Sequence, residues 1–153
     1  MGALSDDMKR VIERQRLGFI ATVCPDGTPN LSPKGTLSVL DDDHLFFADI
    51  RSPGTIANLR MNPSIEVNVV DPLIRKGYRF KGQGTVLESG DQFDQLLAFF
   101  SRRTQSDAPR YIRTIVVVHV ERARPLISPG YASDTDESEM RERWTRYYLG
   151  DAR

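Results

Sequence analysis

Residues 47–63 read FADIRSPGTIANLRMNP and contain the change from strand to helix that decides the fold. An apolar strand is followed by Arg51, and Ser52 before a proline is the N-terminal signal of a short helix. Gly54 lets another group approach the backbone closely. The first-turn N–H groups, the helix dipole, Thr55 Oγ1 and Arg51 would then converge on an anion such as phosphate. An ordinary capped helix, with Arg51 in solvent, is the alternative interpretation.

The segments on either side predict short strands joined mainly by turns. Two glycines in one strand, Gly82 and Gly84, predict a bend or a bulge there. Hairpin geometry places residues 29–40 beside residues 44–49. The pattern favours a mainly β fold with peripheral α-helices, a small antiparallel six-stranded barrel rather than a doubly wound parallel sheet. The expected strands cover residues 18–23, 29–40, 44–49, 65–70, 78–87 and 111–120, and the expected helices 5–18, 53–61 and 91–103, with another near the C-terminus.

Length and charge limit the class of protein. The 153 residues predict a single domain, 1–153, with a C-terminal helical extension. Because 21 basic residues balance 21 acidic ones, we expect no binding to nucleic acid or to a membrane. One cysteine, Cys24, excludes an internal disulfide, and the absence of an apolar N-terminal segment predicts a cytoplasmic protein. No pair of Cys or His residues has ligand spacing, so we assign no metal.

A second polar pattern lies in residues 29–36, PNLSPKGT. In an extended strand Ser32, Lys34 and Thr36 point to one side of the sheet. Gly35 lacks a side chain, so the backbone beside it is open to a flat ligand such as a flavin. Lys34 would then bind a phosphate or stabilise negative charge on the ring. A solvated lysine that protects an edge strand is the alternative.

The run from the PDG turn through SPKG, RSPGT and FKG resembles the pyridoxamine 5′-phosphate oxidase-like family of FMN-binding split barrels. The resemblance covers residues 17–87. It implies a split β-barrel, an FMN cofactor and a homodimer that holds FMN at the subunit interface. It also implies an oxidoreductase that acts on a small molecule.

The same resemblance implies the cofactor-binding residues. Many relatives have Ser-Arg-Lys where this chain has Ser52-Pro53-Gly54, so two phosphate-binding cations are missing. True oxidases have glutamine at the position of Gly77, where only a backbone contact would survive. The residues implied for the ring and ribityl chain are Ser32, Pro33, Lys34, Gly35, Phe47, Ala48, Asp49 and Ile50, and those for the phosphate are Arg51, Ser52 and Thr55, with Arg79 or Lys81 in support.

The sequence does not identify the substrate or the reaction. The C-terminal Arg and His pattern of true pyridoxamine phosphate oxidases has no counterpart here, so we do not predict vitamin B6 oxidation and assign no catalytic residue. His44 and His119 are interpreted as structural. Three alternatives stay open: a flavin carrier or sensor without turnover, a haem protein with one of these histidines as ligand, and a deazaflavin-binding relative. A deazaflavin tail would need a basic groove around Arg75, Lys76 and Arg79.

The last helix carries Trp144, Tyr147 and Tyr148. These side chains either cover the cofactor of a partner subunit or anchor the helix to its own barrel. Aromatic residues at helical spacing usually pack in cores or interfaces, so anchoring is the favoured interpretation.

Overall fold

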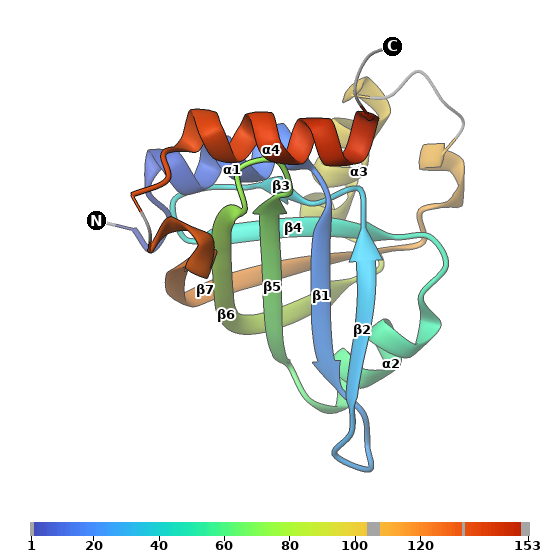
Figure 1. Ribbon diagram of the computed structural model, residues 1–153. Helices are drawn as coiled ribbons and strands as arrows, with labels where there is room; N and C mark the ends of the chain where they lie inside the picture. Colours follow the sequence, from blue (N-terminus) through green and yellow to red (C-terminus); the bar gives the residue numbers. More distant parts are fainter. Residues whose placement is uncertain (1, 104–107, 133, 151–153) are drawn as a thin grey trace.

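The computed structural model describes residues 2–103, 108–132 and 134–150 (Figure 1). Four α-helices and seven strands are present in these residues. The helices are α1 (Asp6–Gln15), α2 (Pro53–Met61), α3 (Asp91–Arg103) and α4 (Glu137–Leu149), with short 3₁₀ turns at Ala108–Tyr111 and Pro129–Tyr131. The strands are β1 (Gly18–Val23), β2 (Pro29–Lys34), β3 (Ser38–Val39), β4 (His44–Asp49), β5 (Ser64–Asp71), β6 (Lys76–Leu87) and β7 (Thr114–Ile127).

The strands form one antiparallel sheet in the order β2-β1-β5-β6-β7-β4-β3. The sheet curls so that β2, at one edge, approaches the end of β4, and Lys34 Nζ lies 3.1 Å from Asp49 Oδ1 (Figure 1). This curled sheet with peripheral helices confirms the predicted split barrel, with seven strands in place of six.

The pairing expected for residues 29–40 was wrong. A turn at Gly35 and Thr36 interrupts this arm, and only the two-residue β3 pairs with β4. The other edge of β4 pairs with β7, from His44 opposite His119 to Asp49 opposite Thr114. Pairing with β7 joins segments about 70 residues apart, which turn signals between neighbouring segments do not report.

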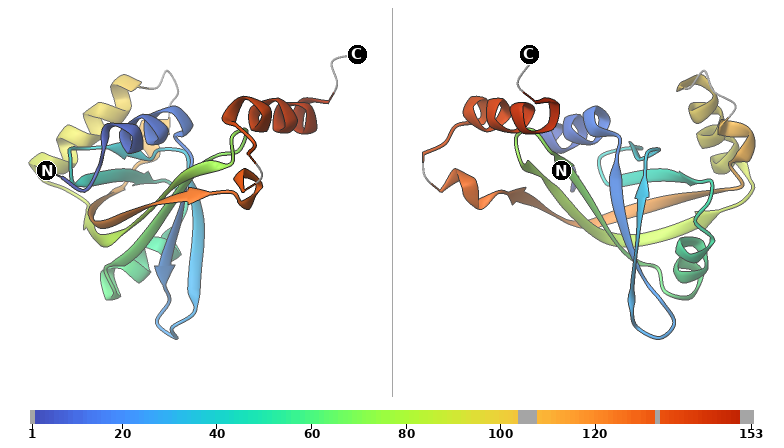
Figure 2. Two further views of the ribbon diagram at one scale, coloured as in Figure 1. Left: turned by 60° about the vertical axis from the view of Figure 1, so that its left-hand side comes forward. Right: turned by 45° about the vertical axis from the view of Figure 1, so that its right-hand side comes forward.

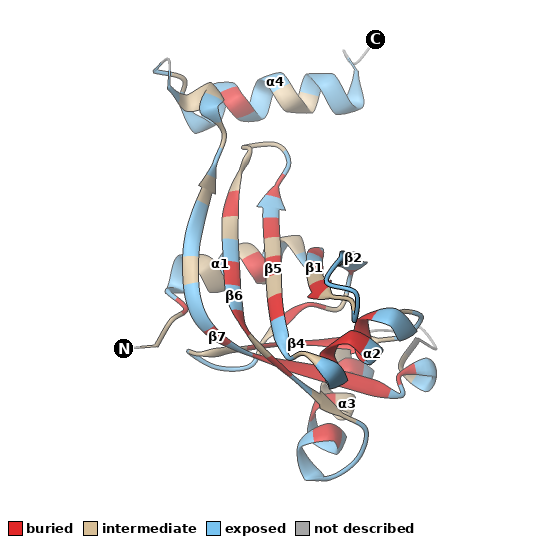
Figure 3. Ribbon diagram, turned by 90° about the horizontal axis from the view of Figure 1, so that it is seen from below, coloured by how far each residue is buried: buried red, intermediate tan, exposed pale blue. Residues whose placement is uncertain are grey.

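Two apolar clusters lie on opposite faces of β4. Leu45 and Phe47 point into the barrel, where they join Phe80 and other buried side chains. Phe46 and Ala48 point the other way, against α3. A strand covered on both faces needs no polar alternation, which explains the continuous apolar run in residues 45–48. In Figure 3 the buried residues accordingly form a continuous band along the crossing strands near α2 and α3.

A bulge interrupts the β6–β7 ladder where the glycines predicted one. Lys81 is opposite Arg122 and Gly82 is opposite Val120, so Glu121 on β7 has no residue across from it. The extra residue therefore lies on β7, and Gly82 on β6 allows the close approach of the two backbones.

Helix α1 ends earlier than the sequence predicts. Ser5 caps its N-terminus by accepting the Met8 N–H at 3.3 Å. Its C-cap is Arg16, with φ 56° in the left-handed region, instead of Gly18. Gly18 is the first residue of β1 instead, and a Cβ there would lie 2.6 Å from Leu37 Cδ2. The glycine is therefore needed for packing of the first strand rather than for ending the helix.

A hydrogen bond from Tyr78 to Asp7 links α1 to β6. It changes the pKa of Tyr78 and therefore the way in which the stability of the fold depends on pH. The Asp7 carboxylate raises the pKa of Tyr78 from 10.0 to about 12. Because the folded-state pKa lies above the unfolded value, this contribution to stability is complete below pH 10 and is lost as the pH rises toward 12. We expect Asp7→Asn to return the pKa of Tyr78 toward 10.0. The measurement is the absorbance of tyrosinate as a function of pH, with the Tyr78→Phe variant subtracted so that only Tyr78 is observed. A wild-type phenol that titrates with the other tyrosines would contradict the hydrogen bond.

Helix α4 lies beside the far end of the β6–β7 ribbon and projects from the barrel (Figure 2). The Arg75 guanidinium lies 3.3 Å from the centre of the Trp144 ring, and Trp144 Nε1 donates to Met140 Sδ at 3.2 Å. Trp144 therefore contacts the β5–β6 turn of its own chain through Arg75, as the anchoring interpretation requires of it. Tyr147 and Tyr148 stay 73% and 52% exposed. Among the described residues, none of the helices is long and apolar enough to cross a membrane.

Candidate functional site

A buried ion pair lies where the end of β2 meets the end of β4. The Lys34 ammonium is 3.1 Å from Asp49 Oδ1 and also hydrogen-bonds Ser52 Oγ. The two charged side chains are only 6% and 12% exposed. Strand β2 directs Lys34 inward because Lys34 shares its face with Ser32, which is opposite the fully buried Ile20. The fold thus holds the Lys34 ammonium, paired with Asp49, in a fixed position beside the start of α2.

The first turn of α2 completes this polar cluster. The Ser52 N–H donates to Asp49 Oδ1 at 2.9 Å, and Ser52 Oγ lies 3.1 Å from Ser32 Oγ. Ser52 was predicted to cap the helix with its hydroxyl, but that oxygen makes no capping hydrogen bond and contacts Lys34 instead. Within a helix the N–H of Gly54 has no partner at this position. An ammonium paired with a carboxylate, two hydroxyls and the positive end of a helix dipole therefore meet here, and the free first-turn N–H groups are the part of this cluster that favours an anion.

Thr55 lies behind this cluster rather than on its open side. Thr55 is 1% exposed, and its Oγ1 accepts the Asn30 amide at 3.3 Å. The same amide donates to Thr22 Oγ1 at 3.2 Å. Asn30 was missed by the sequence analysis, although it shares the alternation of Ser32 and Lys34 on β2. Thr55 and Asn30 hold the start of α2 against β1 and β2.

The backbone is open on the outer side of the cluster. A Cβ built on Gly35 would meet no atom within 4 Å, and one built on Gly54 would meet only Asn30 Oδ1, at 4.0 Å. Both glycines are exposed. A flat group has room to lie against the chain at these two positions.

Two cavities flank the cluster and share Ile50. One, of about 210 Å³, is lined by Gly35 and Thr36 and by side chains of α3. The other, of about 570 Å³, is lined by Asp49, Arg51 and the start of β7. Arg51, Arg60 and Arg113 make this second cavity positive, although Arg60 also pairs with Glu88. Arg113 and Tyr111 precede β7 and carry no motif, so no sequence signal marks them as part of this cavity.

Five of the predicted residues do not join the cluster. Pro33 is exposed on the opposite side of β2. Phe47 and Ala48 are buried in the core, and Ala48 N and O already bond Thr36 Oγ1 at 3.0 and 3.1 Å. Arg79 and Lys81 point out from the other face of the sheet, where they pair with Glu66 at 2.8 and 3.2 Å. Eight residues are brought together: Ser32, Lys34, Gly35, Asp49, Ile50, Arg51, Ser52 and Thr55.

The two histidines lie side by side at another end of the sheet. Their ring centres are 5.1 Å apart, and His44 Nδ1 bonds Asp41 at 2.8 Å. Within the described residues no group of three or more His, Cys, Asp or Glu side chains has the arrangement of a metal site. We therefore place the candidate site at the polar cluster.

The chain was compared with known proteins by sequence and by fold. A profile of the family described as pyridoxamine 5′-phosphate oxidase matches residues 4–126. A search of curated protein sequences found no significant match.

Several solved structures resemble the chain. The protein HupZ of Group A Streptococcus is 28% identical, with a TM-score of 0.72 over 82% of this chain and 95% of its own. An FMN-binding protein of Syntrophomonas wolfei is 18% identical, with a TM-score of 0.66 over 77% and 82%. An F420 reductase is 23% identical, with a TM-score of 0.61 over 79% and 98%. Since the family profile covers most of the sequence and the observed fold agrees with it, the chain belongs to the pyridoxamine 5′-phosphate oxidase family.

Proposed function

We propose that the polar cluster binds the phosphate of FMN and that the protein is an FMN-dependent oxidoreductase of the family, acting on a small molecule. The observation that carries the proposal is the buried Lys34 ammonium, fixed beside Ser52 and the first turn of α2. Buried charges are rare unless they are paired, and this one lies at the end of a helix that favours an anion. A phosphate there would find fixed positive charge and hydroxyl donors.

The residues present compensate for the missing Arg and Lys of other relatives. Arg51 is exposed beside the cluster and lines the positive cavity together with Arg113. Neither guanidinium pairs with a carboxylate among the residues that the structure describes. Both are therefore available to an anion in a way that Arg79 and Lys81, already paired with Glu66, are not.

The surroundings also fit a flat ring. Gly35 offers open backbone, and Ile50 separates the two cavities. When bound, FMN supplies hydride and electron transfer, and the protein supplies binding, orientation and electrostatics. Lys34 would contribute positive charge, and Ile50 would provide apolar contact and exclude water from one side of the ligand.

A second copy of the chain is the proposed partner. The outer face of β1, β2 and β5 exposes apolar side chains, with Phe19 41%, Leu31 65% and Val70 37% exposed. Apolar side chains grouped on one sheet face are typical of protein interfaces. Burial of this face in a homodimer, with the cofactor at the interface, accounts for their exposure in the single chain.

No contact of the described residues favours the alternative of a deazaflavin coenzyme. The groove that its tail would need contains Arg75, Lys76 and Arg79. Arg75 stacks on Trp144, Lys76 pairs with Glu137 at 2.9 Å, and Arg79 pairs with Glu66. Each of these cations is already engaged within the chain.

Titration with FMN and with riboflavin, which lacks the phosphate, tests the proposal. We expect wild type to bind FMN more tightly than riboflavin. Loss of one charged hydrogen bond costs about 1.5–3 kcal/mol, so Arg51→Gln should weaken FMN binding about 10- to 100-fold and leave riboflavin binding unchanged. The matched control is Arg102→Gln, an exposed arginine on α3. Equal affinity for the two flavins, or no flavin binding at all, would overturn the assignment.

A further inference from the structure

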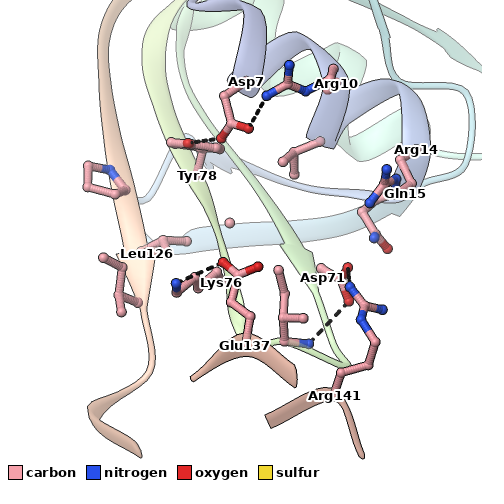
Figure 4. A pocket seen from close by; sticks show the side chains of 15 residues that line it. Asp7, Arg10, Arg14, Gln15, Asp71, Lys76, Tyr78, Leu126, Glu137 and Arg141 are labelled. Carbon is pink, nitrogen blue, oxygen red and sulfur yellow. Dashed lines mark hydrogen bonds and ion pairs between the residues drawn. The ribbon is translucent and has the colours of Figure 1, made fainter. Parts of the chain in front are cut away.

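A separate cavity of about 380 Å³ lies between α1, the β5–β6 turn, the end of β7 and α4 (Figure 4). None of its lining residues belongs to β2, β4 or α2, so it shares nothing with the candidate flavin site. Its volume falls within the range typical of small-molecule sites, about 300–1,000 Å³. The cavity is therefore large enough for a small molecule of its own, separate from the candidate flavin site.

The charges that line the cavity do not balance. Three ion pairs line it: Arg10 with Asp7 at 2.8 Å within α1, and Lys76 with Glu137 at 2.9 Å and Arg141 with Asp71 at 3.6 Å between α4 and the sheet. The fourth cation, Arg14, has no hydrogen bond or ion pair with any residue that the structure describes. Four cations and three carboxylates leave one positive charge.

The uncompensated charge lies at one end of the cavity. Figure 4 shows Arg14 and Gln15, from the last turn of α1, on the same side as Asp71 and Arg141. Gln15 adds an amide donor next to the guanidinium. A guanidinium presents two parallel N–H groups that match the two oxygens of a carboxylate.

The remaining walls are apolar or uncharged. Val11 of α1 and Leu126 of β7 contribute aliphatic surface, and Ile74 and Pro125 extend it. Tyr78 also lines the cavity as a neutral phenol, and its hydroxyl donates a hydrogen bond to Asp7. A ligand would find one anionic anchor and an apolar body site.

We propose that this cavity binds a small organic monocarboxylate, with its carboxylate on Arg14 and its apolar body between Val11 and Leu126. The single excess positive charge matches one carboxylate and disfavours a dianionic phosphate. Helix α4 forms one wall through Glu137 and Arg141, and both residues are paired with β5 or β6. A ligand held between α1 and α4 would therefore also fix α4 against the barrel.

Benzoate is the probe, and its uncharged counterpart benzamide is the matched control ligand. Binding is followed by NMR chemical shifts of the protein without flavin. We expect benzoate to shift amides of α1 and α4, and benzamide to bind at least about tenfold more weakly, because one charged hydrogen bond is worth 1.5–3 kcal/mol. Arg14→Gln should weaken benzoate binding by a similar factor, and Arg102→Gln should not change it.

Four outcomes would overturn the proposal. Benzamide could bind as well as benzoate, Arg14→Gln could leave benzoate binding unchanged, or phenyl phosphate could bind more tightly than benzoate. Shifts confined to residues around Lys34 would place benzoate in the flavin site and would also contradict it. Because the variant and the probe avoid the polar cluster, this test is independent of FMN binding.

Discussion

Asp49→Ala is expected to lower the free energy of unfolding by about 3–5 kcal/mol, the cost of leaving a buried charge without its partner. The Lys34 side chain is 6% exposed, and Asp49, at 3.1 Å, is the one carboxylate that pairs with it among the residues that the structure describes. The hydroxyl of Ser52 would remain, but a hydroxyl carries no charge to offset the ammonium. Denaturant unfolding of the protein without flavin measures the loss.

The double variant Lys34→Met/Asp49→Ala separates an orphaned charge from lost packing. Replacing both members of a buried pair by apolar groups is often close to neutral. Asp49 also accepts the Ser52 N–H at 2.9 Å, so the double variant should remain less stable than wild type by about 1 kcal/mol. If Asp49→Ala alone lowers the free energy of unfolding by less than the double variant does, the Lys34 ammonium reaches water easily and the ion pair is not buried.

The local elements of this fold follow from the sequence because their signals are local. The CPDG turn, residues 24–27, lies in the β1–β2 hairpin, and the Ser52-Pro53 signal sets the start of α2. The partner of β4 could not be predicted in the same way. Its edge pairs with β7, about 70 residues later, and that choice depends on burial of both faces of β4.

The candidate site could be predicted only in part, because its contacts, like the pairing of β4 with β7, join residues that are distant in the sequence. Alternation along β2 correctly groups Ser32 with Lys34, but it does not say which face is inside, since the polar side chains themselves point inward. On β6 the alternation was informative, because Phe80 is fully buried and its neighbours Arg79 and Lys81 must point out. Asp49 as the partner of Lys34 is a contact across the curled sheet that no local pattern contains.

Gly82→Ala is expected to lower the free energy of unfolding by about 3 kcal/mol, at the upper end of the cost of overpacking. A Cβ at this position would lie 1.8 Å from the backbone oxygen of His119 and 3.2 Å from Val120 Cα. Backbone atoms cannot rotate away as a side chain can, so β6 and β7 must separate at the bulge. Thermal or denaturant unfolding measures the effect.

Gly84→Ala on the same strand is the matched control. Its Cβ would lie 3.1 Å from Leu59 Cδ2 and 3.4 Å from Val116 Cγ1, which are ends of side chains. Leu59 can shift by a few tenths of an ångström, and replacing glycine also reduces the entropy of the unfolded chain, so we expect a loss of about 1 kcal/mol or less. Equal losses in the two variants would show that a Cβ at Gly82 costs no more than an ordinary side-chain contact and would contradict the close backbone approach at the bulge. A larger loss at Gly82 would show that the bulge depends on direct contact between the β6 and β7 backbones, the contact that keeps the two strands in register on both sides of Glu121.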